Sequence, residues 1–144
     1  MLVAQNDFLI IDFEGEPART LEERRAKGSP LRDVAGMLRS FDYARWAALR
    51  AAARSDEERA QLAPLVDAWE TEVRQTFLAA YAEGAAGSGL YTTFAQAQDL
   101  LGLFELDKAL YELRYEINNR PDWVRIPLRG ILALAGPQRP AADA

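Results

Sequence analysis

The sequence contains no cysteine and no histidine. Without cysteine, the chain can form no disulfide bond and has no thiolate to act as a nucleophile or metal ligand. Without histidine, it lacks the commonest base at neutral pH and the commonest ligand of transition metals. Hydrolysis by a Ser-His or Cys-His pair is therefore excluded.

Long apolar runs and excess positive charge are also missing. No apolar segment approaches the roughly 20 residues of a membrane-spanning helix, and the start lacks the basic flank and cleavage site of a signal peptide. The formal net charge of −5 argues against unspecific binding to nucleic acid, which needs a positive surface. We therefore expect a soluble, cytoplasmic protein with no membrane or nucleic-acid partner.

Apolar residues make up 49% of the 144 residues, which is enough for the core of one domain. We expect a mainly α-helical domain over residues 1–136, with a β-ribbon at 1–13 and helices within 29–135. The ribbon is expected because 8–11 is short and β-branched, while Asn6-Asp7 favours a turn. Residues 137–144 have nothing to bury and are expected to be disordered.

The second strand of this ribbon ends in carboxylates. Alternate residues of an extended chain share one side, so Asp12, Glu14 and Glu16 can converge there. Such an oxygen cluster suits a hard divalent cation, and magnesium is typically held by one or two carboxylates plus substrate phosphates. The spacing alone also allows a solvated acidic strand end.

Helical periods dominate the rest of the chain. Ser29-Pro30 predicts a helix that starts with Pro30 at its first position and runs to about Arg50. Ser55 predicts the cap of a second helix, which Pro64 kinks or restarts. Their apolar stripes are Leu31, Val34, Ala35, Leu38, Phe41, Ala44, Ala48 and Leu49, and Leu62, Leu65, Val66, Trp69, Val73, Phe77, Ala80 and Tyr81; we interpret the second stripe as a core face, with no binding role for Trp69.

The C-terminal half predicts three further helices. Thr93 caps a short helix through Leu100, a second helix covers 106–118, and Pro127 begins a last helix to Ala135. The expected inner face of the 106–118 helix comprises Leu106, Ala109, Leu110, Leu113 and Ile117, with Tyr111, Glu112, Tyr115 and Glu116 on its flanks.

Two segments together resemble the C-terminal lobe of maltokinase. They are Asp12-Phe13-Glu14-Gly15-Glu16-Pro17 and the segment 29–43, SPLRDVAGMLRSFDY. This family is similar to the aminoglycoside phosphotransferases and, more distantly, to protein kinases, and its members are often fused to trehalose synthase. The resemblance covers about 2–135. It implies a kinase-like helical C-lobe with a short N-terminal β-hairpin, and ATP-dependent phosphorylation of maltose to maltose 1-phosphate in trehalose and glycogen metabolism.

The resemblance also implies roles for individual residues. Asp12 matches the metal-binding Asp of the DFG-type kinase motif and would hold Mg²⁺ against the ATP phosphates, with Glu14 assisting. Asp33 corresponds to a buried Asp that supports the catalytic loop in kinase-like folds. The sequence alone equally allows Asp33 to be a solvated acid in the first turn of a helix.

Four residues near the C-terminus have the carboxylate, guanidinium and aromatic groups that typically bind sugars. Glu112, Tyr115, Arg120 and Trp123 lie in a segment that resembles the C-terminal signature of the family, near its disaccharide pocket. We therefore expect them to bind the substrate. The residues alone also allow Trp123 to plug the core and Arg120 to pair with a surface acid.

A complete maltokinase also has an ATP-binding N-lobe and a His-Gly-Asp catalytic loop, and the sequence contains neither. We interpret the chain as a fragment or truncated product of a larger kinase, with no catalytic residue, no tight binding of Mg²⁺ or ATP, and no activity of its own. In the complete enzyme the partners would be maltose, ATP, and the N-lobe or a trehalose synthase domain.

The alternative hypothesis is a non-catalytic helical interaction or dimerisation module that binds a partner, or the body of trehalose synthase, through the surface where the N-lobe would pack. The N-terminal ribbon is expected either to mediate self-association as a homodimer or to be poorly ordered, because two strands alone are marginal in water. An unrelated helical adaptor is a third hypothesis.

Overall fold

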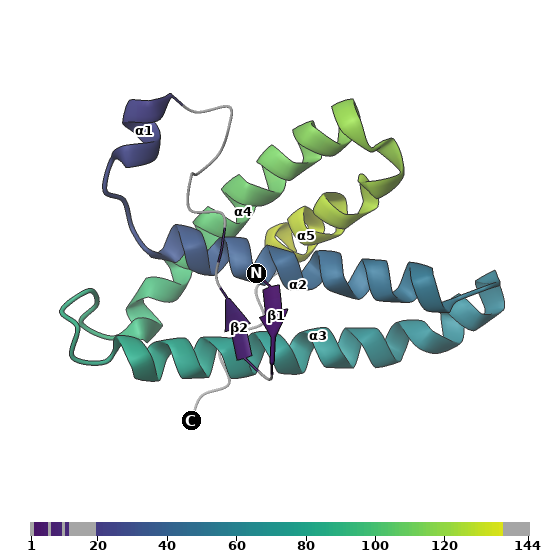
Figure 1. The fold of residues 1–144 in the computed structure, drawn as a ribbon, viewed down its shortest axis with the longest axis horizontal. Coiled ribbons are helices and arrows are strands. Elements are labelled where there is room, and N and C mark those ends of the chain that lie inside the picture. Colours follow the sequence, from purple (N-terminus) through teal and green to yellow (C-terminus); the bar gives the residue numbers. More distant parts are fainter. Residues whose placement is uncertain (1, 6, 10, 12–19, 137–144) are drawn as a thin grey trace.

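The computed structural model describes residues 2–5, 7–9, 11 and 20–136 (Figure 1). The mainly α-helical class predicted from the sequence is confirmed. The elements are β1 (Leu2–Ala4), β2 (Asp7–Leu9), α1 (Leu21–Arg25), α2 (Leu31–Ala52), α3 (Asp56–Ala85), α4 (Phe94–Asn119), the 3-10 helix η1 (Pro121–Trp123) and α5 (Arg125–Ala135).

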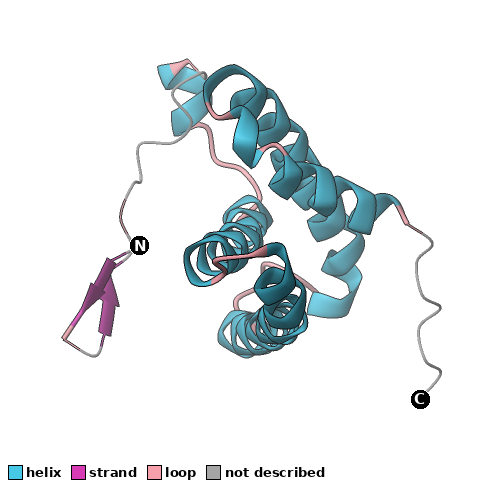
Figure 2. Ribbon diagram, turned by 90° about the vertical axis from the view of Figure 1, so that its right-hand side faces the viewer, coloured by secondary structure: helices cyan, strands magenta, loops and turns pink. Residues whose placement is uncertain are grey.

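The long helix α2 is central to the packing. It contacts α3, α4 and α5, and α4 in turn contacts α5. Figure 2 shows α2 and α3 nearly end on, with α4 and α5 forming a second layer beside them. None of the helices in the described ranges combines the length and hydropathy that a membrane span requires.

The two strands pair antiparallel at the N-terminus. Leu2 lies opposite Leu9, and Ala4 lies opposite Asp7. The turn between the strands contains Gln5, whose φ of 48° is in the left-handed region. Asp7, which we expected in this turn, instead begins β2. The expected extension of the second strand through residues 12 and 13 lies outside the described residues.

Local capping explains where the first two helices start. Thr20 and Glu23 form a reciprocal capping box at the N-terminus of α1. The prediction that Pro30 is the first helical residue of α2 is off by one position, because Pro30 is its N-cap and the helix begins at Leu31. Ser29 still helps, since its hydroxyl accepts a hydrogen bond from the Leu31 amide at 3.3 Å.

The apolar core lies at the N-terminal half of α2. Its fully buried members come from α2 and α4, and aromatic rings surround them. The four residues Leu31, Val34, Ala35 and Leu38 of the predicted stripe are confirmed as buried, and they pack with Ala97 and Leu101.

Further along α2 the predicted stripe is confirmed at Leu49, which is buried, and at Phe41, which packs against the core, but it is wrong at two alanines. Ala44 and Ala48 are exposed, whereas Arg39, Asp42 and Arg45 are buried. Apolar periodicity predicts that the stripe continues through small apolar residues, but the inner face continues through charged side chains because charged partners on the other helices meet them there.

Helix α3 is continuous from Asp56 to Ala85, so it does not restart at Pro64. Ser55 caps it as predicted, accepting a hydrogen bond from the Glu58 amide at 3.1 Å. The interpretation of its stripe as a core face is wrong at two large positions: Leu65 is 66% and Trp69 is 44% exposed. Helix α3 packs mainly against α2 on one side, so part of the predicted apolar stripe remains exposed to solvent.

Helix α4 is also continuous, and the predicted link over 101–106 does not exist. The predicted inner face is displaced: Leu110 and Ile117 are 51% and 57% exposed, whereas Glu112 and Glu116 are buried. The salt bridges of these two carboxylates explain the displacement, because each is held by an arginine.

The loop between α3 and α4 contains two glycines with positive φ. Gly87 and Gly89 have φ values of 72° and 76°, which glycine adopts without a steric penalty. The last helix begins at Arg125 and not at Pro127, which is buried in its first turn. Proline is tolerated in a first turn because its missing N–H has no partner there. The predicted tail over 137–144 lies outside the described residues.

Candidate functional site

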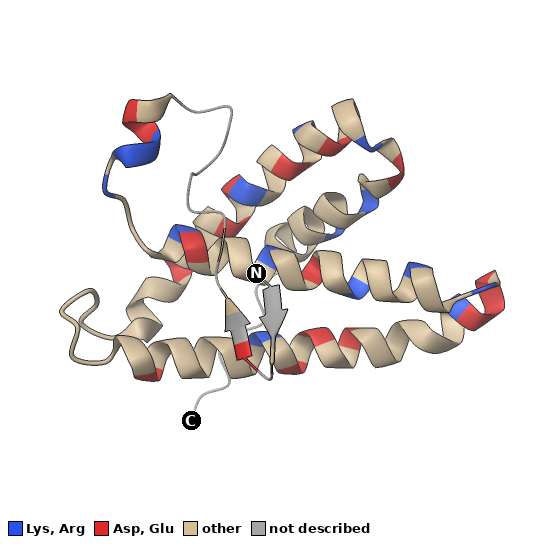
Figure 3. Cartoon of the chain, viewed as in Figure 1, with Lys and Arg blue, Asp and Glu red and all other residues tan. Residues whose placement is uncertain are grey.

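Charged residues of both signs are distributed along α2, α3 and α4, whereas α5, the last of the four long helices, carries only arginines (Figure 3). Several of them meet in the interior, next to the apolar core. We call this group the buried charge cluster; it comprises the buried residues Arg39 and Asp42 of α2, Glu70 of α3 and Glu112 of α4, together with Arg129 of α5, whose side chain is 46% exposed and reaches the cluster from the surface.

Direct ion pairs connect the buried charge cluster across the helices. Arg39, only 1% exposed, donates from Nε to Glu112 Oε2 at 2.9 Å and from Nη1 to Asp42. Arg129 Nη1 donates to Asp42 Oδ1 at 2.9 Å and to Glu70 Oε2 at 2.8 Å. The cluster therefore joins all four long helices at one place.

Two further arginines extend this network along α3. Arg45 pairs with Asp67 and lies 3.4 Å from Glu70 Oε2. Arg74 donates one hydrogen bond to each carboxylate oxygen of Glu105, at 2.8 and 3.1 Å. The bidentate pair of Arg74 with Glu105 fixes orientation as well as charge, so it aligns α3 with α4.

Burial shifts the pKa of two carboxyls in the cluster. Desolvation raises the pKa of Glu112, and the charge of Arg39 opposes this only in part. Desolvation, followed by a hydrogen bond with Asp42, raises the pKa of Glu70. Both carboxyls therefore hold a proton more tightly than in the unfolded chain.

A second group lies where α4 ends and η1 begins, and we call it the turn cluster. Its residues are Tyr43, Tyr115, Glu116, Arg120 and Trp123. Glu116 is 1% exposed and connects the other residues of the cluster. Its carboxylate accepts hydrogen bonds from Tyr43 Oη at 2.8 Å, from Arg120 Nη2 at 2.6 Å and from Arg120 Nε at 2.9 Å.

Aromatic rings complete the turn cluster. Trp123 stacks on Tyr43, with ring centroids 6.1 Å apart. The guanidinium carbon of Arg120 lies 4.9 Å from the Trp123 centroid and 5.6 Å from that of Tyr115. Burial, and then the hydrogen bond to Glu116, raises the pKa of Tyr43 well above its usual range. The hydroxyl therefore stays protonated and acts as a donor.

Three of the four residues predicted to bind a sugar are brought together in the turn cluster: Tyr115, Arg120 and Trp123. Glu112 does not join them, because its carboxylate accepts the hydrogen bond of Arg39 in the buried charge cluster. Arg120 pairs with an acid, as one interpretation of the sequence expected, but that acid is the buried Glu116 and not a surface group.

The expected metal site cannot be placed in the same way. Asp12 and Glu14 lie outside the described residues. Within the described ranges, no group of three or more acidic side chains is arranged to hold a metal ion. Asp33, expected to support a catalytic loop, is exposed in the first turn of α2.

Sequence reasoning missed the two residues that anchor these clusters, Arg39 and Glu116. A usable signal was the spacing of Glu105, Ala109, Glu112 and Glu116, which places three acids on one helical face with a small residue. Continuing the α2 stripe from Leu38 would likewise have reached Asp42 and Arg45. No family model matches the sequence.

Proposed function

We propose that the chain is the helical C-terminal part of a maltokinase-like sugar phosphotransferase, and that the turn cluster belongs to its acceptor-sugar surface. One observation carries the proposal. Arg120 is fixed by the buried Glu116 and lies against the rings of Tyr115 and Trp123. A guanidinium group held between aromatic rings offers hydrogen bonds and apolar ring faces together, which is what a sugar requires.

The remaining hydrogen-bonding capacity of Arg120 supports this role. Its Nε and Nη2 bond to Glu116, which leaves Nη1 for a ligand hydroxyl. The side chain of Arg120 is 45% exposed, and Tyr115 is 46% exposed. A ligand can therefore reach both groups without unfolding the turn.

The kinase part of the proposal rests on the resemblance of 12–17 and 29–43. In the complete enzyme, Asp12 and Glu14 would hold Mg²⁺, which neutralises the charge of the ATP phosphates during phosphoryl transfer. Asp33 lies in the first turn of α2, the helix that would lie under the catalytic loop. The mainly helical architecture is compatible with a kinase-like C-lobe.

Maltose binding by the chain itself tests the sugar-surface proposal. We expect a saturable calorimetric signal on titration with maltose. Tyr115→Ala should weaken binding about tenfold, the equivalent of roughly 1.4 kcal/mol. This variant removes a contact without breaking an ion pair, so it separates binding from folding. Arg54→Ala is the matched control, because Arg54 is exposed in the α2–α3 connection. Equal affinities of the two variants, or no binding to the parent chain, would contradict the proposal.

A second candidate function, a dimerisation module, is favoured by the outer face of α4. Leu103, Leu110 and Ile117 are exposed at a spacing of seven residues, and the half-buried Leu106 and Leu113 lie between them. Alternating spacings of three and four are the pattern of a coiled-coil seam. The face therefore fits a second copy of the same helix.

Charge complementarity selects the direction of this pairing. Asp107 and Arg114 are exposed and occupy equivalent heptad positions beside the seam. Antiparallel pairing would place Asp107 of each copy near Arg114 of the other. In a parallel pair these positions would face Gly102 and Ala109 of the other copy, so no ion pair would form there. We therefore propose an antiparallel contact between two copies of α4.

Sedimentation distinguishes this contact from pairing through the N-terminal ribbon. Leu110→Glu should convert a dimer to a monomer, whereas Leu132→Glu, at a 71% exposed position of α5, should not. A chain lacking the residues before Phe13 should remain dimeric. Loss of the dimer on that truncation, with no effect of Leu110→Glu, would assign the contact to the ribbon instead.

A further inference from the structure

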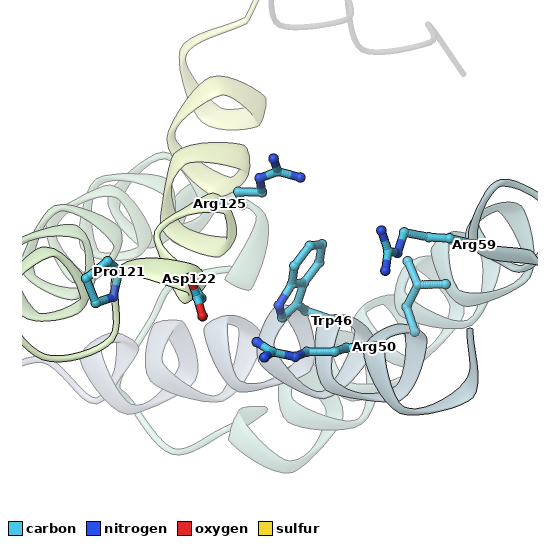
Figure 4. Close-up of a pocket in the computed structure, with 7 residues that line it drawn as sticks. Trp46, Arg50, Arg59, Pro121, Asp122 and Arg125 are labelled. Atoms are coloured by element: carbon cyan, nitrogen blue, oxygen red, sulfur yellow. The ribbon is translucent and has the colours of Figure 1, made fainter. Parts of the chain in front are cut away.

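A pocket of about 440 Å³ lies between the C-terminal half of α2, the start of α3, η1 and α5. We call it the arginine pocket, because Arg50, Arg59 and Arg125 line it from three different helices, together with Trp46 and Asp122. Figure 4 shows the three guanidinium groups around the indole ring of Trp46. Its volume is within the usual range for small-molecule sites.

The charge of this pocket is opposite to that of the chain. The sequence has 22 acidic and 17 basic residues, yet three arginines and one aspartate line the pocket. Arg39, Arg45, Arg74, Arg120 and Arg129 are all held by carboxylates elsewhere.

Two of the three pocket arginines remain available for a ligand. Among the described residues, Arg50 and Arg125 form no ion pair, not even with Asp122. Arg59 pairs with Asp56, which is exposed in the first turn of α3. Positive groups gathered in a concave site focus the electrostatic field and attract an anion.

The wall of the pocket holds a further unsatisfied donor. Trp46 Nε1 is buried and has no hydrogen-bond partner. A buried N–H without an acceptor costs free energy. The indole ring supplies a flat apolar surface next to the three guanidinium groups, while its N–H is covered.

We propose that the arginine pocket binds the phosphate dianion of a small phosphate ester. A carboxylate is satisfied by a single arginine fork, whereas a phosphate dianion offers three oxygens to several guanidinium groups at once. The lining carries three arginines against the single carboxylate of Asp122, and Asp56 pairs with Arg59 from outside the lining. The surplus of positive charge attracts the dianion. The ring of Trp46 accommodates the organic part of the ester.

This inference does not depend on maltose binding. The arginine pocket adjoins the turn cluster, since the Arg50 guanidinium carbon lies 5.9 Å from the Trp123 ring centroid. The two sites nevertheless use different arginines: Arg120 belongs to the turn cluster and does not line the pocket. Variants can therefore separate the two proposals.

Calorimetric titration with glucose 1-phosphate tests the inference, with inorganic phosphate and glucose in parallel arms. We expect saturable binding of the ester, weaker binding of inorganic phosphate and none of glucose. Equal affinity for both anions would identify free phosphate as the ligand and would overturn the ester assignment. The absence of saturable binding by either anion would overturn the whole proposal.

Variants locate the binding. Arg50→Gln and Arg125→Gln should each weaken binding about tenfold or more, because each removes charge-assisted hydrogen bonds. Both positions are exposed, and circular dichroism verifies that each variant folds. Arg54→Gln is the matched control for the loss of one positive charge. If Arg54→Gln weakens binding as much as the two pocket variants, the effect is one of net charge and the pocket is not the site.

Discussion

Gly130 of α5 lies directly against the guanidinium group of Arg39 of α2. A Cβ atom placed on Gly130 would be 2.8 Å from Arg39 Cζ and closer still to Nη1. Arg39 is 1% exposed and cannot swing aside into solvent. The helices α2 and α5 therefore approach this closely because the residue at 130 has no side chain.

The first prediction is that Gly130→Ala destabilises the fold, although alanine favours helix more than glycine does. Overpacking against the fixed guanidinium group should cost about 1–3 kcal/mol. Gly102→Ala is the matched control, because a Cβ there meets no atom within 4 Å. It should stabilise α4 by about 0.5–1 kcal/mol. Urea denaturation of both variants measures these changes, and a stabilised Gly130→Ala chain would contradict the close contact.

The second prediction concerns the partners of Arg39. Arg39→Met keeps an apolar stem but leaves Glu112 without its ion pair, so it should lower the free energy of unfolding by about 3–5 kcal/mol. Arg59→Met removes a pair with the exposed Asp56 and should change the free energy of unfolding by less than about 1 kcal/mol. A double-mutant cycle with Glu112→Leu isolates the pair itself. If Arg39→Met and Arg59→Met lowered the free energy of unfolding equally, burial of the Arg39 ion pair would make no difference to its contribution to stability.

The sequence predicted the helical class and the apolar half of α2 because those features follow from local rules. Ser55 and Thr93 were identified as caps, and both side chains accept a backbone N–H. Leu31 to Leu38 was identified because its period is helical and apolar. Continuity across Pro64 and 101–106 was missed, since tertiary packing outweighs the weak local preferences of single residues.

The candidate site was only partly predictable, for a different reason. Hydrophobic periodicity treats charged residues as solvent-facing, so Glu112 and Glu116 were assigned to the flanks of a helix. Their burial depends on Arg39 and Arg120, and the contact with Arg39 spans 73 positions in sequence. Pairing of that kind comes from the tertiary arrangement of helices, which one sequence does not reveal.

The third prediction is a pH dependence that originates at Glu112. Burial raises its pKa above the usual value of 4.5, so the folded chain holds the proton more tightly than the unfolded chain. Its contribution to stability is full below about pH 4.5 and declines as the pH rises through the raised pKa. Glu112→Gln cannot titrate, so the stability of the parent chain relative to this variant should fall with increasing pH.

Denaturation at several pH values between 4 and 8 measures this difference. The exposed Glu57→Gln is the control for removing a carboxylate outside the cluster. A parent chain that gains stability over Glu112→Gln as the pH rises would mean that Arg39 outweighs desolvation. The direction of the pKa shift would then be reversed.

The last prediction separates support of the turn cluster from binding by it. Tyr43→Phe removes the hydroxyl that donates to Glu116 at 2.8 Å but keeps the ring that stacks on Trp123. A hydrogen bond to a buried charged group contributes about 1.5–3 kcal/mol, so stability should fall by roughly that amount. Because Arg120 still holds Glu116, maltose affinity should not change. Tyr115→Phe is the control for the stability measurement. Urea denaturation measures the free energy of unfolding of each variant, and calorimetric titration measures its affinity for maltose. If Tyr43→Phe loses maltose binding while its stability is unchanged, the hydroxyl contacts the sugar and does not support Glu116.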